Sequence, residues 1–104
     1  MKKKSESIYE KSLERLKSVV LDTLRGEDVM IILFGSRARG DFDRRSDIDI
    51  GIVPKKKYDK KKLILLKEKL EDMNIPYKID LVDISKVSEV FRDKVLKEGK
   101  IWKS

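Results

Sequence analysis

Apolar residues at helical spacing, with charged residues between them, mark the first part of the chain. Between residues 5 and 24 the apolar positions recur every three to five residues, which is typical of an amphipathic helix. Gly26 follows this segment and suits a helix end. Residues 29–34 are a continuous apolar run rich in β-branched side chains, and this short run predicts a buried strand.

A glycine interrupts the pattern directly after the apolar run. Gly35 ends the predicted strand, and residues 37–39 leave room for only about one turn of helix before Gly40. A polar loop over 41–46 then leads to a second predicted strand at 47–53. Because this connection is too short for a parallel crossover, we expect the two strands to be antiparallel.

The second half of the chain holds two further predicted helices and one strand. Apolar positions at helical spacing predict a helix over 60–73, and residues 77–82 predict a third strand. Since the helix between them can form a crossover, the third strand is expected to be parallel to the second. Asp83 is expected to cap a turn or helix, and Ser85 to cap a last helix that Gly99 terminates.

Together these elements predict an α+β fold with the order α-β-α-β-α-β-α. We expect a small mixed three-stranded sheet packed on helices, in a single domain covering 1–104, with residues 1–4 as a disordered basic tail. A domain of this size buries one core, so any substrate larger than a nucleotide would have to be held by another subunit or protein. The sequence leaves the number of subunits open.

The composition excludes several kinds of chemistry. The chain has no Cys and no His, so carboxylates, hydroxyls and bound cations would have to carry out any catalysis. No apolar run is long enough to span a bilayer, and we expect a cytoplasmic protein. The net charge of +7 favours an anionic partner or, alternatively, reflects a lysine coat that keeps the protein soluble.

Gly35 and Ser36 form a candidate phosphate site at the end of the first predicted strand. A glycine at such a turn lets a phosphate approach the backbone, and exposed N–H groups and the Ser36 hydroxyl can donate hydrogen bonds to it. Arg37 or Arg39 could pair with phosphate oxygens. The same pattern is also compatible with an ordinary turn.

Three aspartates form the candidate metal site. Asp47 and Asp49 share one face of the second strand, with Cα atoms about 7 Å apart, and Asp80 has the matching parity in the third strand. If the isoleucine faces of both strands pack on the same helices, the three carboxylates meet on one open sheet face. Such a cluster suits Mg²⁺, which prefers oxygen ligands. Alternatively, the first two residues lie on a solvated strand edge and Asp80 pairs with a lysine such as Lys78.

Taken in order, these pieces resemble the signature of the DNA polymerase β-like nucleotidyltransferase superfamily. Residues 35–49 begin with Gly-Ser-Arg-Ala-Arg-Gly and end with Ser-Asp-Ile-Asp, which is similar to the small prokaryotic branch, the minimal nucleotidyltransferases. Residues 79–83 resemble the third motif of that branch. The resemblance runs from about residue 29 to 82, and it is specific because all three pieces occur in order at these spacings.

The resemblance implies a role for each matching residue. The nucleotide-binding set would hold the triphosphate and neutralise its charge, and it consists of Gly35, Ser36, Arg37 and Arg39. The carboxylate set would hold two Mg²⁺ ions, and it consists of Asp47, Asp49 and Asp80. Within this set, Asp80 is the candidate for helping to deprotonate the acceptor.

The resemblance also implies a substrate and a partner. Members of the small prokaryotic branch commonly act as antitoxins that modify a tyrosine of a HEPN-domain toxin, so we expect transfer of AMP from ATP to a hydroxyl of such a partner. Two alternatives stay open. One is a non-catalytic subunit that neutralises a partner by binding. The other is an enzyme that modifies nucleic-acid ends, which is less favoured because relatives of that type carry additional domains that hold the acceptor.

Overall fold

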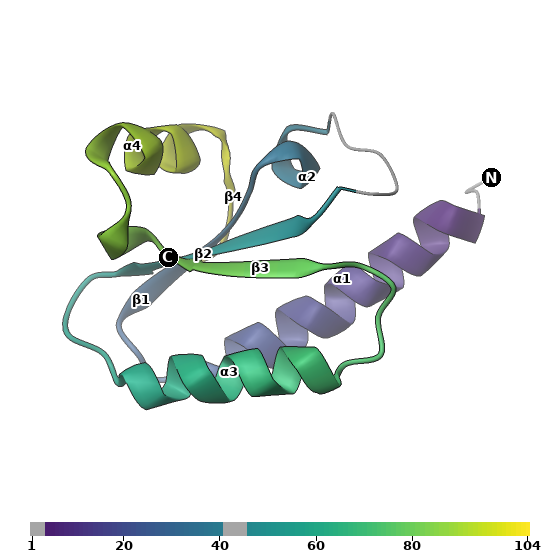
Figure 1. Ribbon diagram of the computed structural model, residues 1–104, viewed down its shortest axis with the longest axis horizontal. Helices are drawn as coiled ribbons and strands as arrows, with labels where there is room; N and C mark the ends of the chain where they lie inside the picture. Colours follow the sequence, from purple (N-terminus) through teal and green to yellow (C-terminus); the bar gives the residue numbers. More distant parts are fainter. Residues whose placement is uncertain (1–3, 41–45) are drawn as a thin grey trace. The chain divides into compact units, whose positions relative to one another are not determined.

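A computed structural model describes all residues except 1–3 and 41–45. The described chain divides into two compact units: a helical unit, formed by residues up to 25 together with 60–75, and a sheet unit formed by the remainder (Figure 1). Most of the predicted basic tail and polar loop lies outside the described residues, although Lys4 already belongs to a helix. That residues 1–104 form a single domain stays a prediction.

The helical unit contains α1 (Lys4–Thr23) and α3 (Lys60–Asp72), which contact each other. Both helices bury apolar positions four residues apart, as the sequence pattern predicts, namely Leu16 and Val20 in α1 and Leu66 and Leu70 in α3. Lys69 Nζ donates a hydrogen bond to Thr23 Oγ1 at 3.3 Å. Within the described part of the chain, no helix has both the length and the apolar character needed to cross a membrane.

The sheet unit contains a mixed sheet with the strand order β3-β2-β1-β4. Its strands are β1 (Val29–Phe34), β2 (Ile48–Pro54), β3 (Ile79–Asp83) and β4 (Lys100–Lys103), and the short helix α2 (Ser36–Arg39) follows β1. As predicted, β1 and β2 are antiparallel, whereas β2 and β3 are parallel. The α+β class predicted from the sequence is therefore confirmed.

A fourth strand was not predicted. The sheet has four strands rather than three, because β4 pairs antiparallel with β1, with a bulge between Ile31 and Ile32. The residues of β4 read Lys-Ile-Trp-Lys, and two apolar side chains between lysines give too weak a pattern to predict a strand. Only the return of the chain to the free edge of β1 makes this segment a strand.

The last helix begins later than the sequence suggested. The chain continues from β3 into the 3₁₀ helix η1 (Ile84–Lys86) and then into α4 (Glu89–Glu98). Ser88 caps α4, because its hydroxyl accepts a hydrogen bond from the Phe91 backbone N–H at 3.2 Å. The prediction that Ser85 caps this helix is wrong, since Ser85 lies within η1.

Both faces of the central strands β1 and β2 are buried over most of their length, which corrects the expected open face. Ile48, Ile50 and Ile52 of β2 are fully buried on one face, as their parity predicts. The opposite face packs against η1 and α4 through a cluster made of Ile32, Phe34, Val53, Ile84 and Val95. Gly51 makes room for this packing, because a Cβ atom there would lie 2.9 Å from Ile84 Cγ1. Only the end of this face, near α2, carries the aspartates.

The cap of α4 can be tested by mutation. We expect Ser88→Ala to lower the free energy of unfolding by about 1 kcal/mol, because the Phe91 N–H loses its acceptor. A loss of this size lowers the Tm of a domain this small by about 4–8 °C, measurable by circular dichroism. Ser18→Ala on the exposed side of α1 is the control and should cause no loss. Equal stability of the two variants would contradict the capping role.

Candidate active site

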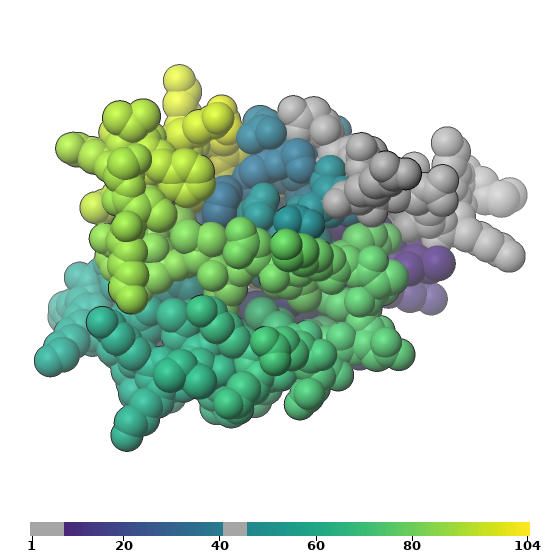
Figure 2. All heavy atoms as spheres, viewed as in Figure 1, coloured from purple at the N-terminus to yellow at the C-terminus, as the bar shows by residue number. Residues whose placement is uncertain are grey.

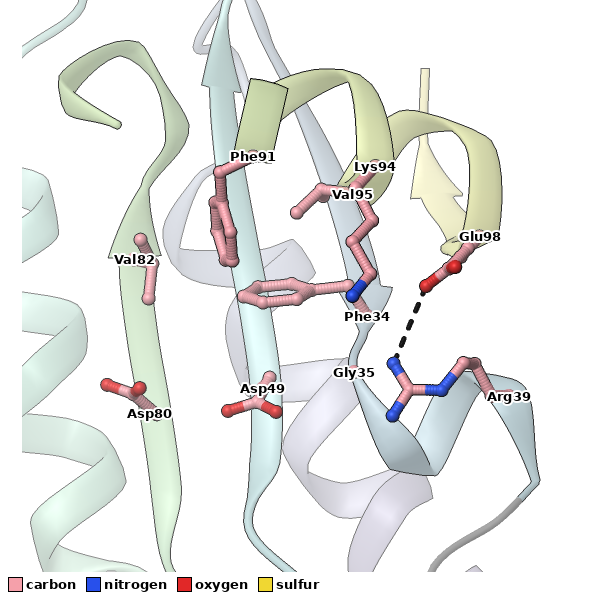
Figure 3. A pocket seen from close by; sticks show the side chains of 10 residues that line it. All are labelled: Phe34, Gly35, Arg39, Asp49, Asp80, Val82, Phe91, Lys94, Val95 and Glu98. Carbon is pink, nitrogen blue, oxygen red and sulfur yellow. Dashed lines mark hydrogen bonds and ion pairs between the residues drawn. The ribbon is translucent and has the colours of Figure 1, made fainter. Parts of the chain in front are cut away.

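A pocket of about 270 Å³ opens in the sheet unit, where the ends of three strands meet α2 and α4 (Figure 3). Its lining comprises Phe34, Gly35, Arg39, Asp49, Asp80, Val82, Phe91, Lys94, Val95 and Glu98. In the space-filling view, side chains fill much of the space between α4 and the strands that the ribbon leaves open (Figure 2). The pocket is therefore a local hollow beside the buried cluster rather than an open sheet face.

Two aspartates from neighbouring strands form one wall of this pocket. In the parallel pairing of β2 with β3, Asp49 lies directly opposite Asp80. Both carboxylates line the pocket, and Figure 3 shows them side by side. The alternation of side chains along the strands predicted that Asp49 and Asp80 share one face, and the register of β2 and β3 makes them neighbours.

Asp47 is not part of the pocket lining. It directly precedes β2, which begins at Ile48, and it is near enough for its charge to act on Asp49. Among the described residues, no three acidic side chains are close enough together to hold a metal ion. The structure therefore brings two of the three predicted carboxylates into the pocket and leaves the third outside its lining.

The electrostatics of this wall act most strongly on Asp49. Burial raises the pKa of its carboxyl group, and the negative charges of Asp80 and Asp47 raise it further, while Arg39 lowers it. The net direction is upward. The site therefore disfavours the ionised form of Asp49. A cation bound to the carboxylate would offset this unfavourable energy.

Gly35 allows the strand end to approach this carboxylate. Its φ angle is 75°, in the left-handed region that favours glycine, and a Cβ atom there would clash with Asp49 Oδ2. The Gly35 carbonyl accepts hydrogen bonds from the Ala38 and Arg39 N–H groups, both at 3.1 Å, and so begins α2. Ser36, the first residue of α2, does not line the pocket. The glycine is thus required for the close packing of α2 beside β2.

The two arginines predicted to bind phosphate have different environments. Arg37 is only 4% exposed. Its Nε and Nη2 atoms donate hydrogen bonds to the Ser46 carbonyl oxygen at 3.2 and 2.9 Å. Its guanidinium carbon lies 5.0 Å from the centre of the Tyr77 ring. Arg39 lines the pocket and forms an ion pair with Glu98 at 3.5 Å. Residues two apart on a helix point in nearly opposite directions. The structure therefore places Arg39, but not Arg37, where it could meet a phosphate.

One face of α4 forms the wall opposite the sheet, and sequence reasoning missed it. Phe91, Lys94, Val95 and Glu98 follow the spacing i, i+3, i+4, i+7 and all line the pocket. The Phe91 ring packs edge-on against Phe34, with centroids 5.9 Å apart and an interplanar angle of 87°. The helical spacing indicated that these residues share one face of α4. The sequence did not show that this face would line a pocket.

A second polar group lies beyond the pocket lining. The Tyr58 hydroxyl donates a hydrogen bond to Asp83 Oδ2 at 3.0 Å. Burial, followed by this hydrogen bond and the charge of Asp83, raises the pKa of Tyr58 to about 12. Burial disfavours ionised Asp83, but hydrogen bonds from Ser85 and Tyr58 outweigh it and lower the pKa of Asp83. Asp83 caps η1, so its predicted capping role is confirmed.

The pocket thus combines three kinds of surface. Asp49 and Asp80 provide two neighbouring carboxylates, which fit Mg²⁺ because this ion is commonly bound by one or two carboxylates together with substrate phosphates. Arg39 and Lys94 provide cationic groups that could meet phosphate oxygens. Phe91 belongs to an apolar wall that suits a planar ring. This combination matches a nucleotide with a polyphosphate tail.

The comparison with protein families agrees with this geometry. The model of the family described as "Polymerase beta, Nucleotidyltransferase" matches residues 21–104, a span that includes every residue lining the pocket. The chain therefore belongs to the polymerase β nucleotidyltransferase family.

Individual relatives are similar over most of the chain. The "probable protein adenylyltransferase MntA" of Haemophilus influenzae is 33% identical over 70 residues, which are 67% of this chain and 61% of that relative, or less than two thirds of its length. A structure described as a minimal nucleotidyltransferase is 26% identical, with a TM-score of 0.69, and the match covers 88% of this chain and 92% of the other.

A further similar structure contains a toxin and an antitoxin. It is the tri-AMPylated HEPN toxin of Shewanella oneidensis in complex with MNT antitoxin. The match has 26% identity and a TM-score of 0.57, and it covers 86% of this chain and 70% of the matched chain.

The raised pKa of Asp49 predicts a pH-dependent effect on stability. Because the folded-state pKa lies above the unfolded value, ionised Asp49 destabilises the folded protein at neutral pH, and this penalty fades as the pH falls through the folded pKa. Without divalent cations, we expect Asp49→Asn to raise the Tm at pH 7 and to lose this advantage in acid. Asp93→Asn, on the side of α4 away from the pocket, should have little effect. An unchanged or lower Tm of Asp49→Asn at pH 7 would contradict the assignment.

Proposed function

We propose that the chain transfers AMP from ATP to a hydroxyl group, with Mg²⁺ bound at Asp49 and Asp80. The observation that carries this proposal is the β2–β3 register, which makes the two carboxylates neighbours in a pocket that also contains Arg39. The family supports nucleotidyl transfer, and the name of the Haemophilus influenzae relative supports AMP as the transferred group.

Each pocket residue has a proposed part in this reaction. Bound Mg²⁺ would stabilise the charge of the reacting phosphate and favour an ionised acceptor oxygen. Gly35 holds the polyphosphate at the start of α2, and Arg39 neutralises part of its charge. A contact from Ser36, which lies next to Gly35 but outside the pocket lining, stays a prediction. The acceptor oxygen bonds to the α-phosphorus of ATP, the bond from this phosphorus to the β-phosphate oxygen breaks, and pyrophosphate leaves. Asp80, the more exposed of the two carboxylates, accepts the proton of the attacking hydroxyl. A second Mg²⁺ between Asp47 and Asp49 stays a prediction.

Arg37 has a positioning role in this scheme. Its two hydrogen bonds to the Ser46 carbonyl connect α2 to the residue preceding Asp47. The buried guanidinium therefore fixes the segment that enters β2, which carries Asp49. Through this connection Arg37 supports the site without touching the nucleotide.

The proposed acceptor is a tyrosine of a HEPN-type protein, so that the chain acts as an antitoxin. The similar structure of an AMPylated HEPN toxin with MNT antitoxin supports this choice. The pocket, at about 270 Å³, is small for a nucleotide and has no room to enclose a protein substrate as well. The acceptor hydroxyl would therefore be presented by the partner at the pocket mouth.

A transfer assay tests this function. The chain is incubated with labelled ATP, MgCl₂ and the HEPN-type protein encoded beside it, and the label on the partner is measured. We expect transfer with the natural sequence, none after removal of Mg²⁺ by EDTA, and rates lower by on the order of 10²–10³-fold for Asp49→Asn and Asp80→Asn. These losses reflect the missing metal ligand.

The matched control is Asp93→Asn, which removes an exposed carboxylate of α4 outside the pocket and should retain full activity. Undiminished transfer by Asp80→Asn would refute the proposed metal site. Neutralisation of the partner without ATP, and equally well by Asp49→Asn, would favour binding alone over catalysis.

A further inference from the structure

We propose that Lys94 of α4 binds the β- and γ-phosphates of the nucleotide, so that α4 and α2 hold the phosphate tail between them. This inference rests on the proposed function and deepens it. Lys94 lies outside the sequence motifs that suggested the site, which end in β3. It would make α4 part of the nucleotide site rather than only a cover for the sheet.

The first support is the position of the side chain. Lys94 belongs to the α4 face that lines the pocket, and Figure 3 shows its chain extending from α4 toward Arg39 and Phe34. Its ammonium group therefore enters the same hollow as the carboxylates of Asp49 and Asp80. A lysine with only a solvating role would extend from the exposed side of the helix, as Lys97 does outside the pocket lining.

The second support is the arrangement of ion pairs around α4. Glu98 lies four residues after Lys94, a spacing at which Lys and Glu commonly pair on a helix. Glu98 instead pairs with Arg39 of α2 at 3.5 Å. Within the part of the chain that the structure describes, Lys94 makes no ion pair, so its charge is available to an anion in the pocket.

The third support is the separation of charge across the pocket. The two aspartates lie on β2 and β3, whereas Arg39 and Lys94 come from α2 and α4. The one carboxylate on the helix side of the described lining, Glu98, is paired with Arg39. A triphosphate with Mg²⁺ on the carboxylate side would present its remaining oxygens to Arg39 and Lys94. Arg39 can form paired hydrogen bonds with phosphate, and lysine acts as a compact point charge on it. The two residues would thus neutralise the tail from one side.

Binding measurements without an acceptor test this role. Titration calorimetry with Mg²⁺ compares AMP-PNP, which has the whole phosphate tail, with AMP, which lacks the β- and γ-phosphates. We expect Lys94→Ala to raise the Kd of AMP-PNP by on the order of 10- to 100-fold while changing that of AMP little. Lys94→Arg should restore most of the affinity, and Lys97→Ala on the same helix should bind like the natural sequence.

The outcomes separate this inference from the proposed function. If the natural sequence does not bind AMP-PNP, the proposed function itself fails. If it binds AMP-PNP but Lys94→Ala binds equally well, the inference is overturned and the function stands. An equal loss of affinity for AMP and AMP-PNP would also overturn it, because Lys94 would then not act on the phosphate tail. Since Lys94 is exposed, its replacement should leave the thermal unfolding of the chain unchanged.

Discussion

The repulsion between Asp49 and Asp80 is the constraint around which the site is arranged. Partial burial disfavours the charge of Asp49, and the parallel pairing of β2 with β3 adds the repulsion of Asp80, its direct neighbour. The fold would be more stable with a neutral residue at position 49. The two carboxylates therefore suit a bound cation. Such a cation would attract both negative charges and so offset their repulsion.

Two glycines let the surrounding elements approach this pair. At Gly35 a side chain would collide with the Asp49 carboxylate, and at Gly51 it would meet Ile84. The first glycine brings α2 to the carboxylates, and the second lets η1 pack on the sheet. As a result, the buried cluster ends where the pocket begins, and α4 reaches over the end of the strands with Phe91 and Lys94.

Membership of the polymerase β nucleotidyltransferase family gives this geometry a chemical meaning. The carboxylates and the glycine turn belong to the part of the chain that resembled the family from the sequence. The α4 face, which the family match also covers, contributes an apolar wall and a lysine to the same pocket.

Local sequence patterns determined the strands of the site and their side-chain parity, because alternation along a strand fixes which residues share a face. They therefore paired Asp80 with Asp49 correctly and identified Gly35 as a turn. Tertiary structure decided the rest. Asp47, which precedes β2, is not among the residues that line the pocket, and Arg37 is buried because α2 turns it toward Ser46. Segment β4 and the pocket-lining face of α4 depend on contacts between residues far apart in the chain, which no local pattern encodes.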